Sequence, residues 1–344
     1  MASPTMKVLQ IVAPYQIEMI EMPVPEPQGR QVRVKRLGIV TCNAYDLHIY
    51  TGKPYPFESG TLEFPQAPGY PGHEWVAMVD KVGPDTSLLK VGDWVCLPGG
   101  RGEAGSYPDG PGGYAPYSVL NETQLIQVPP MDIRKLAPFE MATCVAANML
   151  PLKQINAIRG RKAGVAGLGP AGIIAAQWFR AEGATQVIGI DVDAKRREYA
   201  IAKGIVDRAI NPIGDDGKSL PFRDGGSRGV PEIEISMDCA GAGAAISYLM
   251  DHTTNLVSLF AVQHDPFEYR GWGLGHHLGL IVYGAGTRTF EVSEYAHSVV
   301  TSNKIDLSLA ISHTLRLEEY PKALELIKSQ QSLKVLFTFD ERDW

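Results

Sequence analysis

One glycine-rich segment constrains the fold more than any other feature of this sequence. Gly167, Gly169 and Gly172 form a Gly-x-Gly-x-x-Gly pattern. The pattern follows a predicted strand at 162–166 and opens a predicted helix at 171–182. Glycines at such a junction allow a tight turn and let the backbone approach a pyrophosphate, which then meets the unpaired N–H groups of the helix N-terminus. The segment predicts an α/β domain that binds a dinucleotide.

An acidic residue completes the predicted dinucleotide site. Asp191 ends the next predicted strand, at 186–191, about 20 residues after the glycine turn. A carboxylate at this point accepts hydrogen bonds from a ribose 2′-hydroxyl and repels a 2′-phosphate, which favours NAD over NADP. The residues assigned to the cofactor are therefore Gly167, Leu168, Gly169, Pro170, Ala171, Gly172 and Asp191.

The pattern of predicted elements changes along the chain. A chain of 344 residues is long enough for two domains. Short strand patterns occupy 6–40 and 75–96, with long loops at 53–71 and 98–113. From about residue 140, short apolar strands alternate with helices, which predicts a parallel, doubly wound sheet. After about residue 305 short strands return with one helix, at 317–330.

Composition excludes several classes of protein. The net charge is −6 and no run of Lys or Arg occurs, so a nucleic-acid or anionic-membrane surface has no electrostatic footprint. No stretch of about 18 apolar residues is present, so we expect no membrane span. The N-terminus lacks a secretory signal pattern. The four cysteines are far apart in the sequence, which favours a reducing, cytoplasmic location.

A second group of residues has the chemistry of a metal site. Cys42 follows a predicted strand, His73 lies between Gly72 and Glu74, and Cys144 precedes the nucleotide domain. Two thiolates and an imidazole form a common zinc ligand set, with the fourth position open to a substrate oxygen. Alone, each residue has an ordinary explanation, since a free cysteine is most often a small buried hydrophobe. Only the combination favours catalytic zinc, which would lower the pKa of an alcohol.

Together these residues resemble the zinc-dependent medium-chain alcohol dehydrogenase superfamily, over essentially the whole chain. The similarity rests on the glycine turn and on Gly72-His73-Glu74, Gly92-Asp93-Trp94-Val95, Gly112-Gly113-Tyr114-Ala115-Pro116-Tyr117 and Leu333-Lys334-Val335-Leu336-Phe337-Thr338-Phe339. The resemblance implies a Rossmann domain, a doubly wound parallel sheet, inserted into a β-rich, GroES-like catalytic domain. The expected parts are 1–142 (catalytic, first part), 143–287 (NAD-binding) and 288–344 (catalytic, second part). A homodimer or homotetramer is expected.

The resemblance also assigns roles at the metal site. Cys42, His73 and Cys144 match the catalytic zinc ligands, and Glu74 matches a residue that the family uses as a ligand or near-ligand. Glu140 lies near as an alternative third ligand, but the spacing of Cys144 to the glycine turn fits better. The cysteine-rich lobe that holds a structural zinc in the family is missing, since only Cys96 occurs between residues 85 and 140. No structural zinc is expected.

Further roles concern the proton and the cofactor. Asp46 matches the acid that hydrogen-bonds the zinc-bound histidine, and His48 matches the histidine that passes the alcohol proton to solvent. The family usually has Ser or Thr before that acid as the first proton acceptor; here Tyr45 stands in that place. Lys334 matches a basic residue that contacts the cofactor pyrophosphate.

One departure leaves alternatives open. The family spacing is Cys-x-x-Asp, whereas Cys42 and Asp46 are separated by one residue more. Asn43 and Asp46 instead resemble the Asn-x-x-Asp pattern of zinc-free quinone reductases. The first interpretation is an NAD- and zinc-dependent dehydrogenase of a secondary alcohol, polyol or sugar-like substrate. The alternatives are a zinc-free quinone or enoyl-type reductase and a non-catalytic NAD(H)-binding protein.

Overall fold

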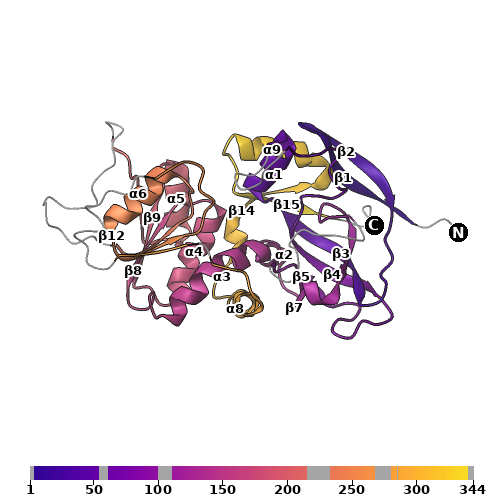
Figure 1. Cartoon of the computed structure of the whole chain (residues 1–344), viewed down its shortest axis with the longest axis horizontal. Coiled ribbons are helices and arrows are strands. Elements are labelled where there is room, and N and C mark those ends of the chain that lie inside the picture. The colour runs from indigo at the N-terminus through magenta and orange to yellow at the C-terminus, as the bar shows by residue number, and fades with distance from the viewer. Residues whose placement is uncertain are drawn as a thin grey trace, which may run out of the picture. The chain divides into compact units, whose positions relative to one another are not determined.

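The computed structural model describes residues 4–53, 61–99, 111–214, 233–267, 280–284 and 286–339. The chain forms two compact units (Figure 1). The first comprises Met1–Thr143, Arg288–Ser302 and Ala310–Trp344, and the second comprises Cys144–Thr287 and Asn303–Leu309. The segment 303–309 thus lies in the second unit, whereas the sequence analysis placed it in the catalytic domain.

The first unit is built on a mixed sheet. In the described residues its order is β14, β15, β3, β4, β5, β7, and β6 pairs with β3. The strands are β3 (Gln31–Val40), β4 (Glu74–Val82), β5 (Trp94–Cys96), β6 (Tyr117–Asn121), β7 (Ile126–Val128), β14 (Ile311–Arg316) and β15 (Lys334–Thr338). A separate antiparallel hairpin consists of β1 (Thr5–Ala13) and β2 (Gln16–Pro23). The predicted strand patterns at 6–40 and 75–96 correspond to these elements.

Helices of the first unit lie mostly in its connections and its C-terminal part. They are α1 (Asn43–Thr51), α2 (Ile133–Leu136), α8 (Phe290–Thr301), α9 (Tyr320–Lys328) and the start of α3 (Phe139–Gln154), which continues into the second unit. Short 3-10 turns span Glu122–Gln124, Leu307–Ala310 and Leu317–Glu319. The predicted helix at 317–330 is therefore the last of these turns followed by α9.

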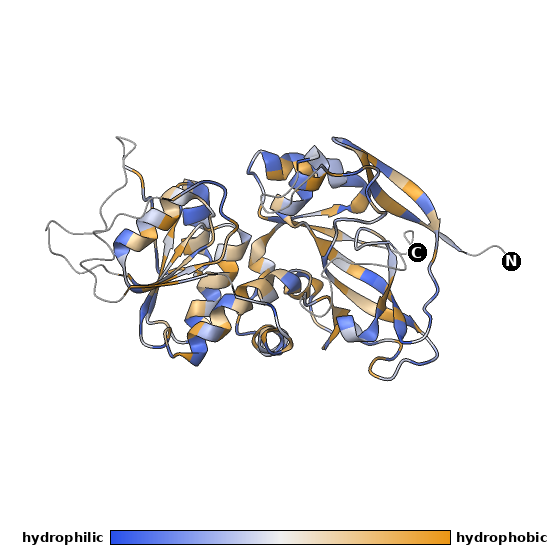
Figure 2. Ribbon diagram, viewed as in Figure 1, coloured by the Kyte–Doolittle hydropathy of each residue, from blue (hydrophilic) through white to orange (hydrophobic). Residues whose placement is uncertain are grey.

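Alternation along β3 explains how the sheet of the first unit is buried. Val32 and Val34 are fully buried, and the charged side chains of Arg33 and Lys35, which alternate with them, remain partly exposed. Figure 2 shows the same alternation of hydrophobic and hydrophilic residues along this sheet. Period-two alternation places every second side chain on the core face, so the pattern fixes which face of the strand is covered.

Two glycine segments of the first unit cross in close contact. The N–H of Gly113 donates to the carbonyl of Gly72 at 2.9 Å, and the N–H of Tyr114 donates to the carbonyl of Gly69 at 3.0 Å. A Cβ on Gly69 would lie 2.7 Å from the backbone of Gly112. Real Cβ atoms do not approach a backbone that closely, so only glycine permits this crossing. The crossing fixes the loop that leads into β4.

The second unit contains the predicted doubly wound sheet. Six strands pair in parallel in the order β10, β9, β8, β11, β12, β13. They are β8 (Lys162–Ala166), β9 (Gln186–Ile190), β10 (Arg208–Ile210), β11 (Ile233–Asp238), β12 (Thr253–Leu259) and β13 (Ile281–Tyr283). Helices α4 (Pro170–Ala181), α5 (Ala194–Ala202) and α6 (Gly243–His252) pack on this sheet. The strand–helix–strand pattern read from the sequence is confirmed here.

Several helices are absent from the sequence-based prediction. In α1, polar Asp46 is buried along with Ile49 while apolar Leu47 remains partly exposed, so its sequence carries no clear apolar stripe. In α3, Pro151 lies inside the helix, where a proline ordinarily indicates a break. Among the helices that the structure describes, none combines the length and the apolar character needed to cross a membrane.

Candidate active site

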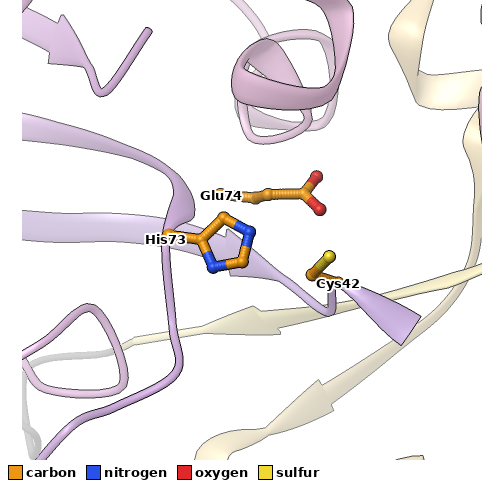
Figure 3. Close-up of side chains that lie close together, drawn as sticks. All are labelled: Cys42, His73 and Glu74. Carbon is orange, nitrogen blue, oxygen red and sulfur yellow. The ribbon is translucent and has the colours of Figure 1, made fainter. Parts of the chain in front are cut away.

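Three side chains with metal-binding chemistry meet in the first unit. Cys42 Sγ, one ring nitrogen of His73 and one carboxylate oxygen of Glu74 all lie within 4.8 Å of one another. Figure 3 shows the three side chains converging on a common point. The sheet register explains the meeting, because Val40 at the end of β3 pairs with Glu74 at the start of β4. Residues just beyond these strand ends are thereby placed side by side.

The ring of His73 is oriented by its own loop. Its Nδ1 lies 2.7 Å from the carbonyl oxygen of Pro71, an acceptor, so Nδ1 carries the proton and Nε2 keeps its lone pair for a ligand. The sequence analysis expected Asp46 to make this hydrogen bond. In the structure the Pro71 carbonyl, two residues upstream of His73, makes this hydrogen bond instead.

Asp46 instead holds the backbone of Cys42. Its Oδ2 accepts hydrogen bonds from the Cys42 N–H at 3.0 Å and from the Tyr114 hydroxyl at 2.6 Å. The Asp46 N–H donates to the Cys42 carbonyl at 2.8 Å, so the two residues span one helical turn. This turn accommodates the additional residue between them. Burial raises the pKa of Asp46 to about 6, although the Tyr114 hydroxyl opposes the shift.

Cys42 lies at the N-terminal cap of α1. A helix N-terminus stabilises negative charge, which suits a thiolate ligand. Burial, followed by the neighbouring carboxylate of Glu74, raises the pKa of the thiol well above its usual value in the metal-free protein. A thiol of this kind needs a cation to become a thiolate.

A buried ion pair borders the cluster. The Lys334 ammonium lies 2.7 Å from Glu74 Oε1 and donates to the Thr41 carbonyl at 2.8 Å, with Lys334 1% and Glu74 0% exposed. Burial raises the pKa of Glu74, while Lys334 opposes the shift. Burial lowers the pKa of Lys334, but the charges of Glu74, Cys42 and Glu140 and the hydrogen bond to Glu74 together outweigh it, and the net shift is upward. The pyrophosphate contact of Lys334 stays a prediction; the ammonium is held here by Glu74.

The two candidates for the third ligand, Glu140 and Cys144, lie on α3. Glu140 is 4% exposed and forms an ion pair with Arg288. Its negative charge contributes to the raised pKa of Glu74, so it lies near the cluster. Cys144, one helical turn later, is the first residue of the second unit and is not among the three clustered residues. Its role as a ligand stays a prediction.

Two tyrosines lie beside the cluster. The Tyr45 ring packs edge-on against the His73 ring with centroids 5.7 Å apart. The hydroxyls of Tyr45 and Tyr70 form a short hydrogen bond. His48 lies one turn after Tyr45 in α1 and is half-buried. The sequence analysis did not identify Tyr70, although its position just before Gly72-His73-Glu74 could have drawn attention to it.

The residues present fit a zinc ion. Thiolate, imidazole and carboxylate are all zinc ligands, and ligand atoms of a tetrahedral zinc lie roughly 3.3–3.8 Å apart. The ligand atoms of the cluster lie within 4.8 Å of one another, which is compatible with this spacing. Glu74 Oε2 is buried and has no hydrogen-bond partner among the residues that the structure describes. A bound cation would satisfy this buried carboxylate oxygen.

The glycine turn in the second unit has the geometry that its sequence predicts. Gly167 has a φ of +88°, and a Cβ on Gly172 would lie 1.8 Å from the Gly167 carbonyl oxygen. At Gly169 a Cβ would meet nothing within 4 Å, so this face is open to a ligand. The Leu168 N–H donates to Asp191 Oδ2 at 2.7 Å. The structure thus joins the turn directly to the acid expected to bind the ribose.

Comparison with known proteins agrees with this architecture. The alcohol dehydrogenase GroES-like domain matches residues 27–130. Over 98% of the chain and 100% of the relative, it is 26% identical to an L-threonine 3-dehydrogenase of Pectobacterium carotovorum. The chain belongs to the medium-chain alcohol dehydrogenase superfamily. Two solved dehydrogenases show the same fold.

The first solved relative is a zinc-binding dehydrogenase from Sinorhizobium meliloti bound to NADP, with a TM-score of 0.79 at 20% identity, covering 98% of this chain and 100% of the other. The second is an alcohol dehydrogenase from Escherichia coli CFT073 complexed with NADH, with a TM-score of 0.77 at 22% identity, covering 97% and 99%. The curated relative and both solved relatives are dehydrogenases, and the two solved ones hold NADP or NADH.

Proposed function

We propose that this protein oxidises a hydroxyl group of a secondary alcohol, polyol or sugar-like substrate to a carbonyl and transfers the hydride to NAD. The convergence of Cys42, His73 and Glu74 carries the proposal, because hydride transfer alone needs no such ligand set. Zinc is the metal that this donor set favours, and Cys144 is the ligand that the sequence adds. Bound there, zinc would supply a Lewis acid that lowers the pKa of the substrate hydroxyl.

The chain's own residues prepare the ligand set. Asp46 fixes the backbone of Cys42 at the start of α1, and the Pro71 carbonyl fixes the ring of His73. Lys334 offsets part of the negative charge of Glu74 without using its second oxygen. Ligands held by outer hydrogen bonds lose less freedom on binding a metal, which favours a preformed site.

The preference for NAD is proposed from Asp191. Its carboxylate lies against the glycine turn, with Leu168 N–H on one oxygen and Asp193 N–H on the other. A carboxylate at this place accepts hydrogen bonds from the ribose hydroxyls and repels a 2′-phosphate. Arg196 Nη1 lies 3.9 Å from Asp191 Oδ2 and does not remove this charge from the turn. The NADP found in the Sinorhizobium relative makes the comparison of the two cofactors worth measuring.

Proton release is proposed to begin at Tyr45 and to involve His48. The hydroxyl proton must leave the reacting centre as the hydride departs from carbon. Tyr45 packs on the His73 ring and carries a hydroxyl, so it stands where the first acceptor is needed. His48 lies on the same helix one turn later, and imidazole suits proton transfer near neutral pH.

The experiment combines metal analysis with a substrate screen. Protein purified without chelators is analysed for zinc, and reduction of NAD is followed with L-threonine, secondary alcohols and polyols. His73→Ala is expected to lose both the zinc and the turnover, because an incomplete ligand set forfeits the Lewis acid. His297→Ala, on α8 in the same unit, serves as the matched control and should retain both.

Two outcomes contradict the proposal. Full activity in metal-free protein would replace it with the zinc-free reductase, which keeps hydride transfer and survives chelation. Tight NAD(H) binding without turnover of any tested compound would favour the non-catalytic alternative. Zinc bound in wild type and lost in His73→Ala, together with NAD reduction, supports the proposal.

A further inference from the structure

The hydrogen bond between Tyr45 and Tyr70 joins two separate parts of the first unit. Tyr45 lies in the first turn of α1, and Tyr70 lies in the loop that leads to His73. Their hydroxyls are in short contact, and their rings pack edge to face with centroids 6.0 Å apart. The Tyr45 ring also contacts the ring of His73. A chain of two hydroxyls therefore starts beside the proposed metal ligand.

The loop that carries Tyr70 is held firmly on both sides. The Gly69 N–H donates to the Leu9 carbonyl at 2.7 Å, and the Gly112 N–H donates to the Pro68 carbonyl at 2.8 Å. The Tyr70 N–H donates to the Ala67 carbonyl at 3.1 Å. Backbone hydrogen bonds hold the chain on each side of Tyr70, and the crossing of the two glycine segments adds to them. This segment therefore has little freedom to move. The position of the Tyr70 hydroxyl is thus set by the fold before any substrate binds.

We propose that Tyr70 is the second hydroxyl of a proton relay that begins at Tyr45. This inference rests on the proposed dehydrogenase function. As the substrate hydroxyl gives its proton to the Tyr45 oxygen, Tyr45 gives its own proton to the Tyr70 oxygen, and Tyr70 gives its own to water. The substrate C–H bond breaks with its electron pair, which leaves as hydride to NAD. One proton reaches solvent, and neither tyrosine changes its net charge.

The geometry favours Tyr70 over His48 as the partner that receives the proton from Tyr45. The hydrogen bond that the structure gives the Tyr45 hydroxyl runs to Tyr70. Tyr70 is only half-buried, so its side chain reaches from the cluster toward solvent. Proton transfer needs a donor and an acceptor within hydrogen-bond reach of each other, and the hydroxyls of Tyr45 and Tyr70 meet this condition.

The kinetic test compares variants that each lose one hydroxyl. Tyr70→Phe keeps the ring packing and removes the second hydroxyl, while His48→Gln removes the competing group. Tyr50→Phe is the matched control, because Tyr50 lies on the same helix and its hydroxyl donates to the Tyr15 carbonyl, at 3.2 Å, rather than to Tyr70. Each is measured with the panel compound, L-threonine or a polyol, that the wild type oxidises fastest, in mixtures of H₂O and D₂O.

Tyr70→Phe is expected to lower kcat about 10- to 100-fold with little change in KM, within the range that positioned proton transfer contributes. The dependence of the rate on deuterium fraction should be curved in wild type, since several protons move together, and linear in Tyr70→Phe. Tyr50→Phe should match wild type. A Tyr70→Phe variant that keeps both kcat and the curved dependence overturns the inference, as does a loss of curvature in His48→Gln alone.

A second measurement does not depend on activity. A proton held in the hydrogen bond between the Tyr45 and Tyr70 hydroxyls should give a resolved hydroxyl resonance in wild-type and metal-free protein, which is missing from both Tyr45→Phe and Tyr70→Phe. Absence of this resonance in wild type overturns the relay. Zinc content should be equal in wild type and Tyr70→Phe. Failure of the proposed function has a different signature: the resonance is present, but wild type holds no zinc and reduces no NAD.

Discussion

Replacing Lys334 with Met tests the buried ion pair at the edge of the cluster. Lys334 and Glu74 are 1% and 0% exposed, and their charged atoms lie 2.7 Å apart. Methionine has a similar length and fills the space without a charge. The carboxylate of Glu74 then remains buried without its counter-charge, and the Thr41 carbonyl loses its donor.

The expected loss of free energy of unfolding is large because Glu74 is buried and water cannot solvate its charge. Removing one partner of a buried ion pair costs about 3–5 kcal/mol, whereas an exposed pair contributes about 0–1 kcal/mol. Lys322→Met provides the matched control, since Lys322 pairs with Glu319 at 3.0 Å on the surface, with side chains 61% and 42% exposed. The double variant Lys334→Met/Glu74→Gln should be less destabilised than the sum of the two single variants, because no uncompensated charge is left.

The assay is urea unfolding of metal-free and zinc-loaded protein, followed by tryptophan fluorescence, since Trp75 is fully buried in the same unit. Zinc gives Glu74 a new positive neighbour, so the penalty of Lys334→Met should shrink when zinc is present. A penalty below about 1 kcal/mol in metal-free protein, equal to that of Lys322→Met, would refute the reasoning. So would a penalty that zinc leaves unchanged.

Three further predictions concern the second unit. Gly172→Ala should destabilise the turn, because its Cβ would lie 1.8 Å from the Gly167 carbonyl, whereas Gly169→Ala should retain stability and weaken NADH binding; equal melting temperatures for the two variants would contradict this. Asp191→Ala should raise the KM for NAD and reduce the difference between the KM values for NAD and NADP; a wild type that already prefers NADP would show that Asp191 does not select NAD through its ribose. Burial raises the pKa of Asp238 to about 6, whereas an aspartate in the unfolded chain has a pKa of about 3.9, so its contribution to stability is present below pH 4 and is lost, by about 3 kcal/mol, as the pH rises through 6. Asp238→Asn should remove that decline in a series of urea titrations, and an unchanged slope would count against it.

The fold of the second unit follows closely from its sequence, and its physical basis is plain. Buried parallel strands such as β8 and β9 read as short apolar runs, and α4 between them has a clear apolar stripe. The predicted strand at 162–166 has the same bounds as β8. Local pattern and tertiary environment agree in this region, so periodicity alone was sufficient.

The candidate site was less accessible to sequence reasoning. Cys42, His73 and Glu74 were named because their chemistry is distinctive, and the β3–β4 register brings them together. The hydrogen-bond partners of His73 and Asp46 were not foreseen, since Pro71 acts through its backbone carbonyl and Tyr114 comes from a distant loop. Backbone acceptors and long-range contacts leave no signature in the spacing of side chains.

The crossing of the two glycine segments has a consequence for exchanging parts between related dehydrogenases. A Cβ on Gly112 would lie 2.5 Å from the Gly69 carbonyl oxygen, and one on Gly113 would lie 2.6 Å from that of Gly72. Neither segment can accept a side chain at the crossing while the other keeps its path. In a chimera, residues 69–72 and 112–114 must therefore be transplanted as a pair. Replacing either segment alone with one that lacks the glycines would displace the loop that carries His73.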